Sequence, residues 1–400
     1  MSTLAARTGG VPAMLRFALD TLRSAGLEPI VAHYEPYSQA PQLSVPAWAL
    51  GRRRPASQAA PPMFGAPTHA VGAWLPELEF THYLPTPAWR QLMAGCDAFL
   101  VVSGNALAAT AFARTGRPYV AWVATDWEGD RRDRVRNFPL PRRLLDRWVN
   151  APVIRRLERE VLGRGHTLAL SEHTARSLDA LTPAPCVRGT LPMPVDVERF
   201  RPDPAARVPG RIGFSGRIDD PRKNIDLLLE AFARLRSQGL GTSLHLIGGA
   251  PTPALAQAAQ RLGIAEQVVF VPHLSPDELA QTLRTLDVFV LPSHQEGLCI
   301  AALEAMASGV PVVSTRCGGP QEYVIPGQTG ELVGFDPAEM AEAIGALLRE
   351  PQRRQVQGTA ARALIERRYT LQRSRSTLLQ ALATTFPHLQ MHSHGGTRTP

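Results

Sequence analysis

Residues 286–315, LDVFVLPSHQEGLCIAALEAMASGVPVVST, decide the fold of the second half of the chain. The apolar runs at 288–291 and 310–314 have the length and the Val and Leu content of buried strands. The intervening stretch, 298–308, consists mostly of small and apolar helix formers. A buried strand, a helix and a second buried strand predict one unit of a parallel α/β sheet.

The same alternation extends on both sides of this unit. Short apolar strands and amphipathic helices of this kind predict a doubly wound sheet. The predicted strands are 211–214, 243–247, 268–271, 288–291, 310–314 and 331–333. The predicted helices are 224–237, 253–262, 276–286, 298–308 and 337–349, followed by a helical stretch over 352–384.

The first half predicts a similar but weaker pattern. A glycine pair, Gly9 and Gly10, precedes an amphipathic helix over 12–24. Because a strand normally leads into such a glycine loop, we expect a first strand that is short or partly missing. The Pro- and Ala-rich stretch 40–67 predicts an exposed loop without a core of its own. Further strands are expected at 29–33, 98–102, 119–123 and 167–170.

With 400 residues, the chain is too long for one compact core. A segment rich in proline and charge, LPMPVDVERFRPDPAARVPGR, predicts the connection between two domains. We therefore expect a first domain over 1–205, a second over 206–370, and a C-terminal helix with a disordered tail over 371–400.

The composition is that of a water-soluble protein, with 44% hydrophobic and 20% charged residues. No apolar run is long enough for a transmembrane helix, and the start lacks the pattern of a secretory signal. The four cysteines are scattered without metal-ligand spacing. These features favour a reduced, cytoplasmic protein. The net charge of +8 is spread along the chain, which favours phosphorylated ligands or anionic surfaces over nucleic acid.

The only lysine of the chain, Lys223, lies in the loop FSGRIDDPRKN after the strand at 211–214. Gly216 permits close approach of a ligand there. Arg217 offers a forked donor and Lys223 a compact charge, a combination that suits a diphosphate. The alternative is a solvated basic loop. Gly248, in LIGGAP after the strand at 243–247, is a weaker candidate because any tight turn uses glycine.

Two glutamates, Glu296 and Glu304, lie at the entrance of the predicted helix 298–308 and within it. The helix start favours an anion, and Glu296 is placed to accept hydrogen bonds from sugar hydroxyls. At 1.5 Å per residue the two carboxylates lie up to roughly 12 Å apart, beyond the spacing of a hydrolase pair. They therefore suit two parts of one long ligand. The alternative makes Glu296 a helix N-cap and Glu304 a surface residue.

These motifs resemble the retaining GT-B glycosyltransferases of the GT4-like group, glycosyl transferases group 1. Glu296 and Glu304 look like its E-x7-E signature, and GRIDDPRKNIDLLLEAF, EGLCIAALEAMASGVPVVSTRCGGPQEYV and GQTGELV follow in its order. The resemblance covers 211–349 closely and the first half in outline. It implies two Rossmann-like, doubly wound α/β domains facing a cleft.

The resemblance also implies roles for single residues. Arg217 and Lys223 match the basic pair that holds the donor diphosphate, and Glu304 matches the glutamate on the nucleotide ribose. Glu296 matches the glutamate that contacts the donor sugar. Gly297, Leu298 and Cys299 match the positions whose backbone contacts sugar and phosphate, and Gly9 and Gly10 match the glycine loop that faces the donor phosphates.

Two positions depart from the family pattern. Asn224 stands where glycine is frequent after the lysine. Asp126, in PYVAWVATDWEGD, stands near the position where many members carry a histidine, and it is our candidate for acceptor handling.

The expected function is transfer of a sugar, with retention, from a nucleotide-diphosphate donor to a carbohydrate or lipid-linked acceptor. No cofactor and no metal are expected, because no Asp-x-Asp motif is present and fixed cations balance the leaving group. One alternative is a nucleotide-sugar-binding protein that has lost transfer. A Rossmann-type oxidoreductase is disfavoured, since no G-x-G-x-x-G opens a strand-helix unit.

All six tryptophans precede the predicted linker. They pack the first domain, or they form an acceptor platform. The arginine-rich segment 131–164, with Trp148, is either a solvated helix face or a peripheral contact with an anionic membrane at the inner face.

Overall fold

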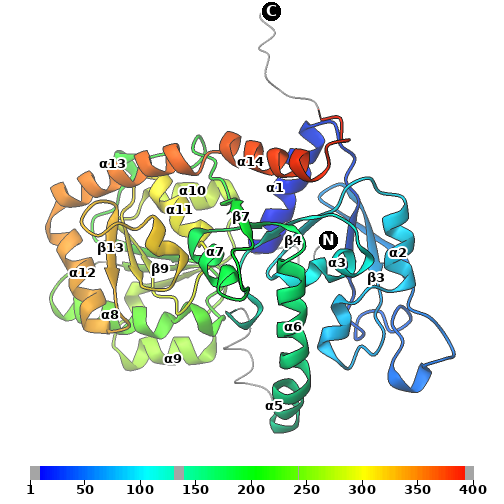
Figure 1. Cartoon of the computed structure of the whole chain (residues 1–400). Helices are drawn as coiled ribbons and strands as arrows, with labels where there is room; N and C mark the ends of the chain where they lie inside the picture. The colour runs from blue at the N-terminus through cyan, green and yellow to red at the C-terminus, as the bar shows by residue number, and fades with distance from the viewer. Residues whose placement is uncertain (1–9, 130–138, 242, 392–400) are drawn as a thin grey trace, which may run out of the picture. The chain divides into compact units, whose positions relative to one another are not determined.

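The computed structural model describes residues 10–129, 139–241 and 243–391. The chain forms two compact units. Unit 1 contains the described residues up to Leu191 and those from Arg375 onward, and unit 2 is Pro192–Ser374. Figure 1 labels the helices and some of the strands of both units.

Unit 2 is built on a six-stranded sheet whose strand order is β10-β9-β8-β11-β12-β13, with every pairing parallel. The chain moves from β8 outward to β10, returns to β11, and then moves outward in the other direction. Strand order therefore reverses between β8 and β11. The strands are β8 (Arg211–Ser215), β9 (Ser243–Ile247), β10 (Val268–Val271), β11 (Val288–Leu291), β12 (Val312–Thr315) and β13 (Gly330–Val333).

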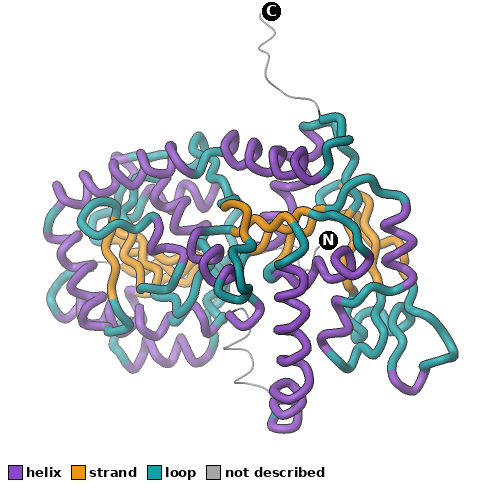
Figure 2. Tube along the Cα trace, viewed as in Figure 1, coloured by secondary structure: helices purple, strands orange, loops and turns teal. Residues whose placement is uncertain are grey.

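Helices surround these strands in unit 2 (Figure 2). α8 packs against α9 and α12, whereas α11 packs against α10 and α13. Right-handed crossovers explain the two groups, because connections that run in opposite directions along a parallel sheet lie on opposite faces. The helices are α8 (Ile225–Ser237), α9 (Pro253–Arg261), α10 (Pro276–Arg284), α11 (Ile300–Ala307), α12 (Pro337–Arg349) and α13 (Pro351–Arg368).

The core of unit 2 lies between the sheet and these helices. All four residues of β11 and all four of β12 are buried. Phe214, Phe232 and Phe289 are among the largest side chains that are fully buried. The predicted doubly wound sheet is confirmed in this half, since strands buried on both faces carry the continuous apolar runs that the sequence shows.

Unit 1 contains two sheets. One is a parallel sheet of order β4-β5-β6-β7. The other has the order β1-β3-β2, in which β1 and β3 are parallel and β2 and β3 antiparallel. Its strands are β1 (Val31–Tyr34), β2 (Ser57–Met63), β3 (Ala66–Val71), β4 (Leu100–Ser103), β5 (Val120–Val123), β6 (His166–Ala169) and β7 (Val187–Thr190).

The helices of unit 1 include one before β1 and several between the strands of the four-stranded sheet. They are α1 (Gly10–Ser24), α2 (Pro87–Ala94), α3 (Thr110–Thr115), α5 (Leu140–Leu145), α6 (Ala151–Leu162) and α7 (Glu172–Asp179). The expected first strand and tail lie largely in 1–9 and 392–400, outside the described residues.

The prediction of an exposed loop over 40–67 was wrong. It contains β2 and the start of β3, and Ala40 and Leu43 pack with Ala70 in a small core. Two prolines, Pro61 and Pro62, concealed the strand in the sequence. They are tolerated because β2 is an edge strand, where one side of the backbone needs no sheet partner.

We expected the boundary between the two domains at residue 205, but unit 2 already begins at Pro192. The connection already belongs to unit 2: the Val195 N–H donates to the Tyr369 carbonyl at 2.9 Å, and Arg362 donates to the Val197 and Phe200 carbonyls. Helix α14 (Leu371–Thr385) begins in unit 2 and continues in unit 1, where Phe386 packs against Phe99. It is therefore not a separate C-terminal segment.

Candidate functional site

The point where strand order reverses, between β8 and β11, is the place where open α/β sheets bind ligands. The loop after β8 carries Lys223 and the loop after β11 carries Glu296. Two hydrogen bonds join these loops. The His294 N–H donates to the Arg222 carbonyl at 2.8 Å, and the Asn224 side-chain amide donates to the Pro292 carbonyl at 3.2 Å. The two strongest sequence candidates therefore lie together at the carboxyl edge of the sheet.

Lys223 and Glu296 form an ion pair. Nζ lies 2.5 Å from Oε1, and the two side chains are 17% and 11% exposed. The Ser293 hydroxyl donates to the same oxygen at 2.7 Å. Burial by itself would lower the pKa of Lys223, but the negative charge of Glu296 outweighs it, and the pKa lies above its ordinary value. The lysine therefore stays charged at any physiological pH.

This pair retains hydrogen-bond capacity. An ammonium has three donors, and Glu296 is the one side-chain partner of Lys223 among the described residues. Oε2 of Glu296 accepts no hydrogen bond from the residues in the described ranges. Two cationic N–H donors and one carboxylate oxygen thus remain side by side, and these groups suit a phosphate and a hydroxyl.

The turn that presents Lys223 depends on its neighbours. The Asp220 carboxylate accepts from the Arg222 N–H at 3.1 Å and caps the 3-10 turn Pro221–Lys223. Asn224 has φ 51°, a left-handed conformation that Gly and Asn adopt more readily than other residues. The turn therefore explains why asparagine can stand at a position where glycine is frequent in the family that the motifs resemble.

Arg217 does not contact Lys223. Its guanidinium pairs with Asp220 at 2.7 Å and its side chain is 60% exposed. Arg222 bonds the same carboxylate at 2.8 Å. Burial works to raise the pKa of Asp220, but the bonds and charge of Arg222, with Arg217, hold it below its ordinary value. The expected role of Arg217 on a diphosphate therefore remains a prediction.

Glycines allow the loops at this edge to touch one another. A Cβ on Gly248, which has φ 129°, would lie 2.1 Å from the Gly216 carbonyl oxygen. A Cβ on Gly319 would lie 2.1 Å from the carbonyl oxygen of Gly297. Close contact between backbones therefore explains Gly319 and favours the tight-turn alternative for Gly248.

The segment from Gly297 to Cys299 leads into α11. Cys299 has φ 64° and occupies the N-cap position, so Glu296 is not the helix cap. The Tyr323 hydroxyl, fully buried, donates to the Leu298 carbonyl at 2.5 Å. No described residue accepts a hydrogen bond from the N–H of Gly297 or Leu298. These donors and the N-terminus of α11 offer a further place for an anion.

Glu304 lies within α11 and is partly buried. Its carboxylate has no hydrogen bond or ion pair with the described part of the chain. Burial raises the pKa of Glu304 to about 8, and the positive charge of Arg199 opposes this shift only in part. A partly buried carboxyl group without hydrogen-bond partners among the described residues fits a ligand contact better than a solvated surface position.

Sequence reasoning did not identify Ser293, Asp220 or Tyr323 as parts of this site. Each acts through a hydrogen bond to a residue of the two loops. The one signal available in advance was the position of Ser293 and Asp220 three residues before Glu296 and Lys223. Tyr323 follows a later strand, and only the fold brings it to Leu298.

The first-half candidates belong to unit 1. Gly10 begins α1 and is exposed, while Gly9 lies outside the described residues. Asp126 accepts a hydrogen bond from the Gly129 N–H at 2.6 Å, the geometry of a residue that caps a helical turn. This bond gives Asp126 a structural role that needs no ligand.

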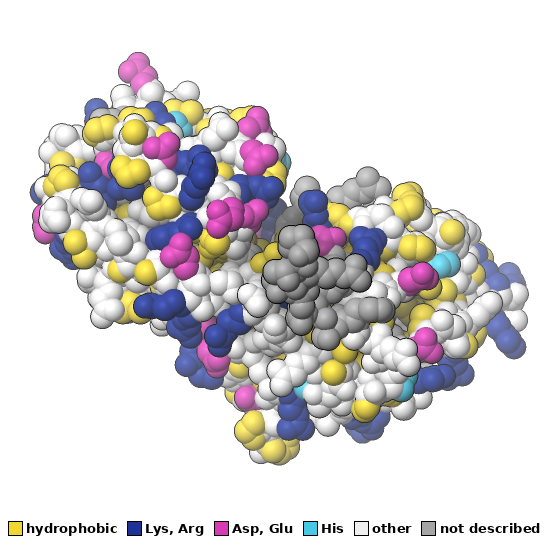
Figure 3. All heavy atoms as spheres, turned by 90° about the horizontal axis from the view of Figure 1, so that it is seen from above, with side chains coloured by type: hydrophobic (Ala, Val, Ile, Leu, Met, Phe, Trp, Pro, Cys, Tyr) yellow, Lys and Arg dark blue, Asp and Glu magenta, His cyan; other side chains and the backbone are white. Residues whose placement is uncertain are grey.

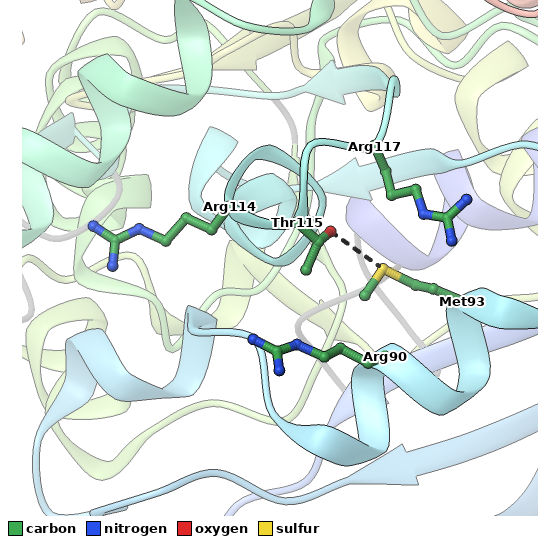
Figure 4. Close-up of a pocket in the computed structure, with 5 residues that line it drawn as sticks. All are labelled: Arg90, Met93, Arg114, Thr115 and Arg117. Carbon is green, nitrogen blue, oxygen red and sulfur yellow. Dashed lines mark hydrogen bonds between the residues drawn. The ribbon is translucent and has the colours of Figure 1, made fainter.

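A cavity of about 380 Å³ in unit 1 contains none of the predicted site residues. Its lining residues come from α2, α3 and the segment after α3, and are Arg90, Met93, Arg114, Thr115 and Arg117 (Figure 4). Arg114 is paired with Glu160 at 3.1 Å, and the guanidinium groups of Arg114 and Arg117 point in opposite directions. The three arginines therefore do not converge on one anion.

Two features define the class of this protein: unit 2 is doubly wound with a basic–acidic pair at its switch point, and unit 1 is a second α/β unit. Two such units make up the GT-B fold of glycosyltransferases. Residues 209–350 match the family described as glycosyl transferases group 1.

Curated relatives and solved structures agree with this class. The chain is 36% identical over 235 residues to the GDP-mannose-dependent alpha-(1-6)-phosphatidylinositol monomannoside mannosyltransferase of Mycolicibacterium smegmatis, covering 54% of this chain and 61% of that protein. It is 36% identical over 189 residues to the D-inositol 3-phosphate glycosyltransferase of Nocardia farcinica, covering 43% and 42%. The chain thus spans less than two thirds of either relative.

Solved structures share the fold over nearly the whole chain. Sucrose-phosphate synthase from Thermosynechococcus elongatus has a TM-score of 0.71 at 20% identity, covering 96% of this chain and 95% of that one. HepE from Anabaena, in complex with UDP, also has a TM-score of 0.71, at 15% identity, covering 96% and 98%. At these identities the likeness shows the GT-B fold.

Proposed function

We propose that this protein is a glycosyltransferase that moves a sugar from a nucleotide-diphosphate donor to a carbohydrate or lipid-linked acceptor. The observation that carries the proposal is the Lys223–Glu296 pair at the switch point of unit 2, with two N–H donors and one carboxylate oxygen unused. The lysine suits the diphosphate and the glutamate suits a hydroxyl of the sugar. The GDP-mannose dependence of one relative and the UDP bound to HepE support a nucleotide donor.

In this reaction the bond between the anomeric carbon and the diphosphate breaks, and a bond to an acceptor oxygen forms as that oxygen loses its proton. Negative charge grows on the leaving phosphate. Lys223, Arg217 and the N–H groups before α11 are fixed positive groups that stabilise this charge as it develops. We propose that these groups replace a metal ion, and that transfer proceeds with retention, as in the family that the motifs resemble.

The acceptor is proposed from the relatives and from unit 1. The names of two relatives specify a phosphatidylinositol mannoside and an inositol phosphate, both of which present a ring of hydroxyl groups. Unit 1 has a second cavity of about 380 Å³ directly after β1, whose lining includes Tyr34, Tyr37, His82 and Tyr83. Aromatic faces and phenolic hydroxyls of this kind suit a ring that is apolar on its faces and polar at its edge.

A second candidate function is binding of a nucleotide sugar without transfer. The observation that favours it is the Asp126 carboxylate, which is engaged with the Gly129 N–H where the family often has a histidine. Donor binding is common to both functions, so transfer and slow hydrolysis of the donor distinguish them.

The experiment is a thermal-shift screen of the purified chain against UDP-, GDP- and ADP-sugars, followed by transfer and hydrolysis assays with the best donor. We expect one donor to raise Tm, and Lys223→Ala to abolish the shift. Arg234→Ala, which removes an exposed arginine of α8, is the control and should leave the shift unchanged. If no nucleotide sugar shifts Tm, or if Lys223→Ala responds like the wild-type protein, the proposal is wrong.

A further inference from the structure

The exposed face of α5 and α6 is unusual for a helix of a globular unit. From α5 into the first turn of α6, six large apolar side chains are more than a third exposed. They are Leu140 at 71%, Leu144 at 58%, Leu145 at 39%, Trp148 at 70%, Val149 at 38% and Val153 at 36%. Scattered single apolar residues need no explanation on a surface, but a contiguous patch marks a site of interaction.

These side chains form one face because of their spacing. Leu140, Leu144 and Trp148 are four residues apart, and Leu145, Val149 and Val153 form a parallel row. A short π-helix, Asp146–Asn150, joins α5 to α6. In Figure 1 the two helices make one rod, with α5 at the end away from β4. We call these six residues the apolar ridge.

One side of α6 is anchored in unit 1, whereas α5 has no buried residue. Ile154 and Leu157 of α6 are buried with Leu107 and Trp127 in one hydrophobic cluster. The helix already has an apolar face for folding. The ridge is therefore additional, and folding of unit 1 does not account for it.

The charges along the ridge are mainly positive. Between residues 139 and 156 the sequence has five arginines and one acidic residue, Asp146, which is 6% exposed. Arg147 lies over the Trp148 ring, 5.5 Å from its centroid. Arg155 is within 3.3 Å of Glu128, whereas Arg156 has no ion pair with any residue that the structure describes. Elsewhere, on the face in Figure 3, basic and acidic side chains are intermingled.

We propose that the apolar ridge, with Arg147 and Arg156, docks unit 1 on an anionic membrane surface. Leu side chains insert at the boundary between headgroups and acyl chains, a tryptophan lies at the level of the headgroups, and arginines contact lipid phosphates. A second copy of the chain is the less suitable occupant, because a symmetric contact would bring two rows of arginines together. No helix in the described ranges is both long enough and apolar enough to cross a bilayer, so the docking is peripheral.

The test is co-sedimentation of the full chain with vesicles of phosphatidylcholine alone and of an equal mixture of phosphatidylcholine and phosphatidylglycerol. We expect binding to the mixed vesicles, weakened by added salt because the arginine contacts are screened. The double variant Leu144→Glu with Trp148→Glu should lower the bound fraction at least about tenfold. Arg147→Gln with Arg156→Gln should lower it less and remove most of the salt dependence.

The matched control is Val356→Glu on α13, because Val356 is 56% exposed and Leu144 is 58% exposed. It should bind vesicles as the wild-type chain does, and all variants should keep the wild-type Tm because the altered side chains are exposed. Equal binding of the Leu144 and Trp148 variant and the wild-type chain would overturn the proposal. So would self-association that this variant abolishes in the absence of vesicle binding. The readout is independent of nucleotide binding, so its failure would leave the glycosyltransferase proposal standing.

Discussion

The two units differ in how their sequence candidates are used. In unit 2, Lys223 and Glu296 are 73 residues apart in the sequence and contact each other, with hydrogen-bond capacity left for a ligand. In unit 1, the Asp126 carboxylate accepts a hydrogen bond from the Gly129 N–H, only three residues away. Bringing charged groups together from distant parts of the sequence costs desolvation, which a functional role offsets, whereas a local cap needs no ligand to account for it. The difference supports the proposal that the donor binds to unit 2.

The largest effect is expected for Lys223→Ala. Removing the ammonium leaves Glu296 partly buried without its cation and removes the donors for the diphosphate. We expect turnover to fall by about two to three orders of magnitude, in line with loss of a group that stabilises developing charge. Initial rates with saturating donor measure it, and Lys223→Arg should recover part of the loss. Wild-type turnover in Lys223→Ala would remove the distinction between the units.

A smaller effect is expected for Arg217→Ala. Arg217 is 60% exposed and its charge is already compensated by Asp220. We therefore expect turnover to fall by about tenfold, at the low end of the effect of one stabilising donor. The same rate assay measures it, with Arg234→Ala as the control. A loss as large as that of Lys223→Ala would mean that Arg217 leaves Asp220 and joins the lysine on the diphosphate.

Glu304→Gln should alter the pH dependence of stability. Because the folded state raises the pKa of Glu304 from its ordinary value to about 8, the folded protein binds the proton more tightly than the unfolded chain. Stability is then lost as pH rises from about 4.5 toward about 8. The variant lacks this titration, so its Tm should exceed that of the wild-type protein by several degrees at pH 8 and by little at pH 4.

The same variant should bind nucleotide more weakly if Glu304 contacts the ribose. Calorimetric titration with a nucleoside diphosphate measures this, and turnover at saturating donor should change less than affinity. An equal Tm difference at both pH values would contradict the assignment of the raised pKa to Glu304.

The smallest effect on turnover is expected for Asp126→Ala. Loss of its bond to the Gly129 N–H should cost about 1 kcal/mol of unfolding free energy, as for other helix caps. Turnover should stay within about twofold of wild type. Denaturant unfolding and the rate assay distinguish the two roles. A hundredfold loss of turnover with unchanged stability would make Asp126 a catalytic group and would erase the contrast between the units.

The same contrast limits what could be predicted from sequence. The strands and helices of unit 2 were located within a few residues because buried parallel strands are continuous apolar runs. The hairpin of β2 and β3 was missed because Pro61 and Pro62 disguise an edge strand. At the site, the loops could be placed from topology, but the pairing of Arg217 with Asp220 and of Tyr323 with Leu298 depends on side-chain geometry that no spacing encodes.

The most direct measurement of the central claim is a crystal structure of the full chain with a nucleoside diphosphate and with its sugar donor. We predict that Lys223 Nζ lies within about 3 Å of a phosphate oxygen and that Glu296 Oε2 accepts from a sugar hydroxyl, at the switch point between β8 and β11. A diphosphate bound away from this point, with the Lys223–Glu296 pair making no contact to it, would contradict the account.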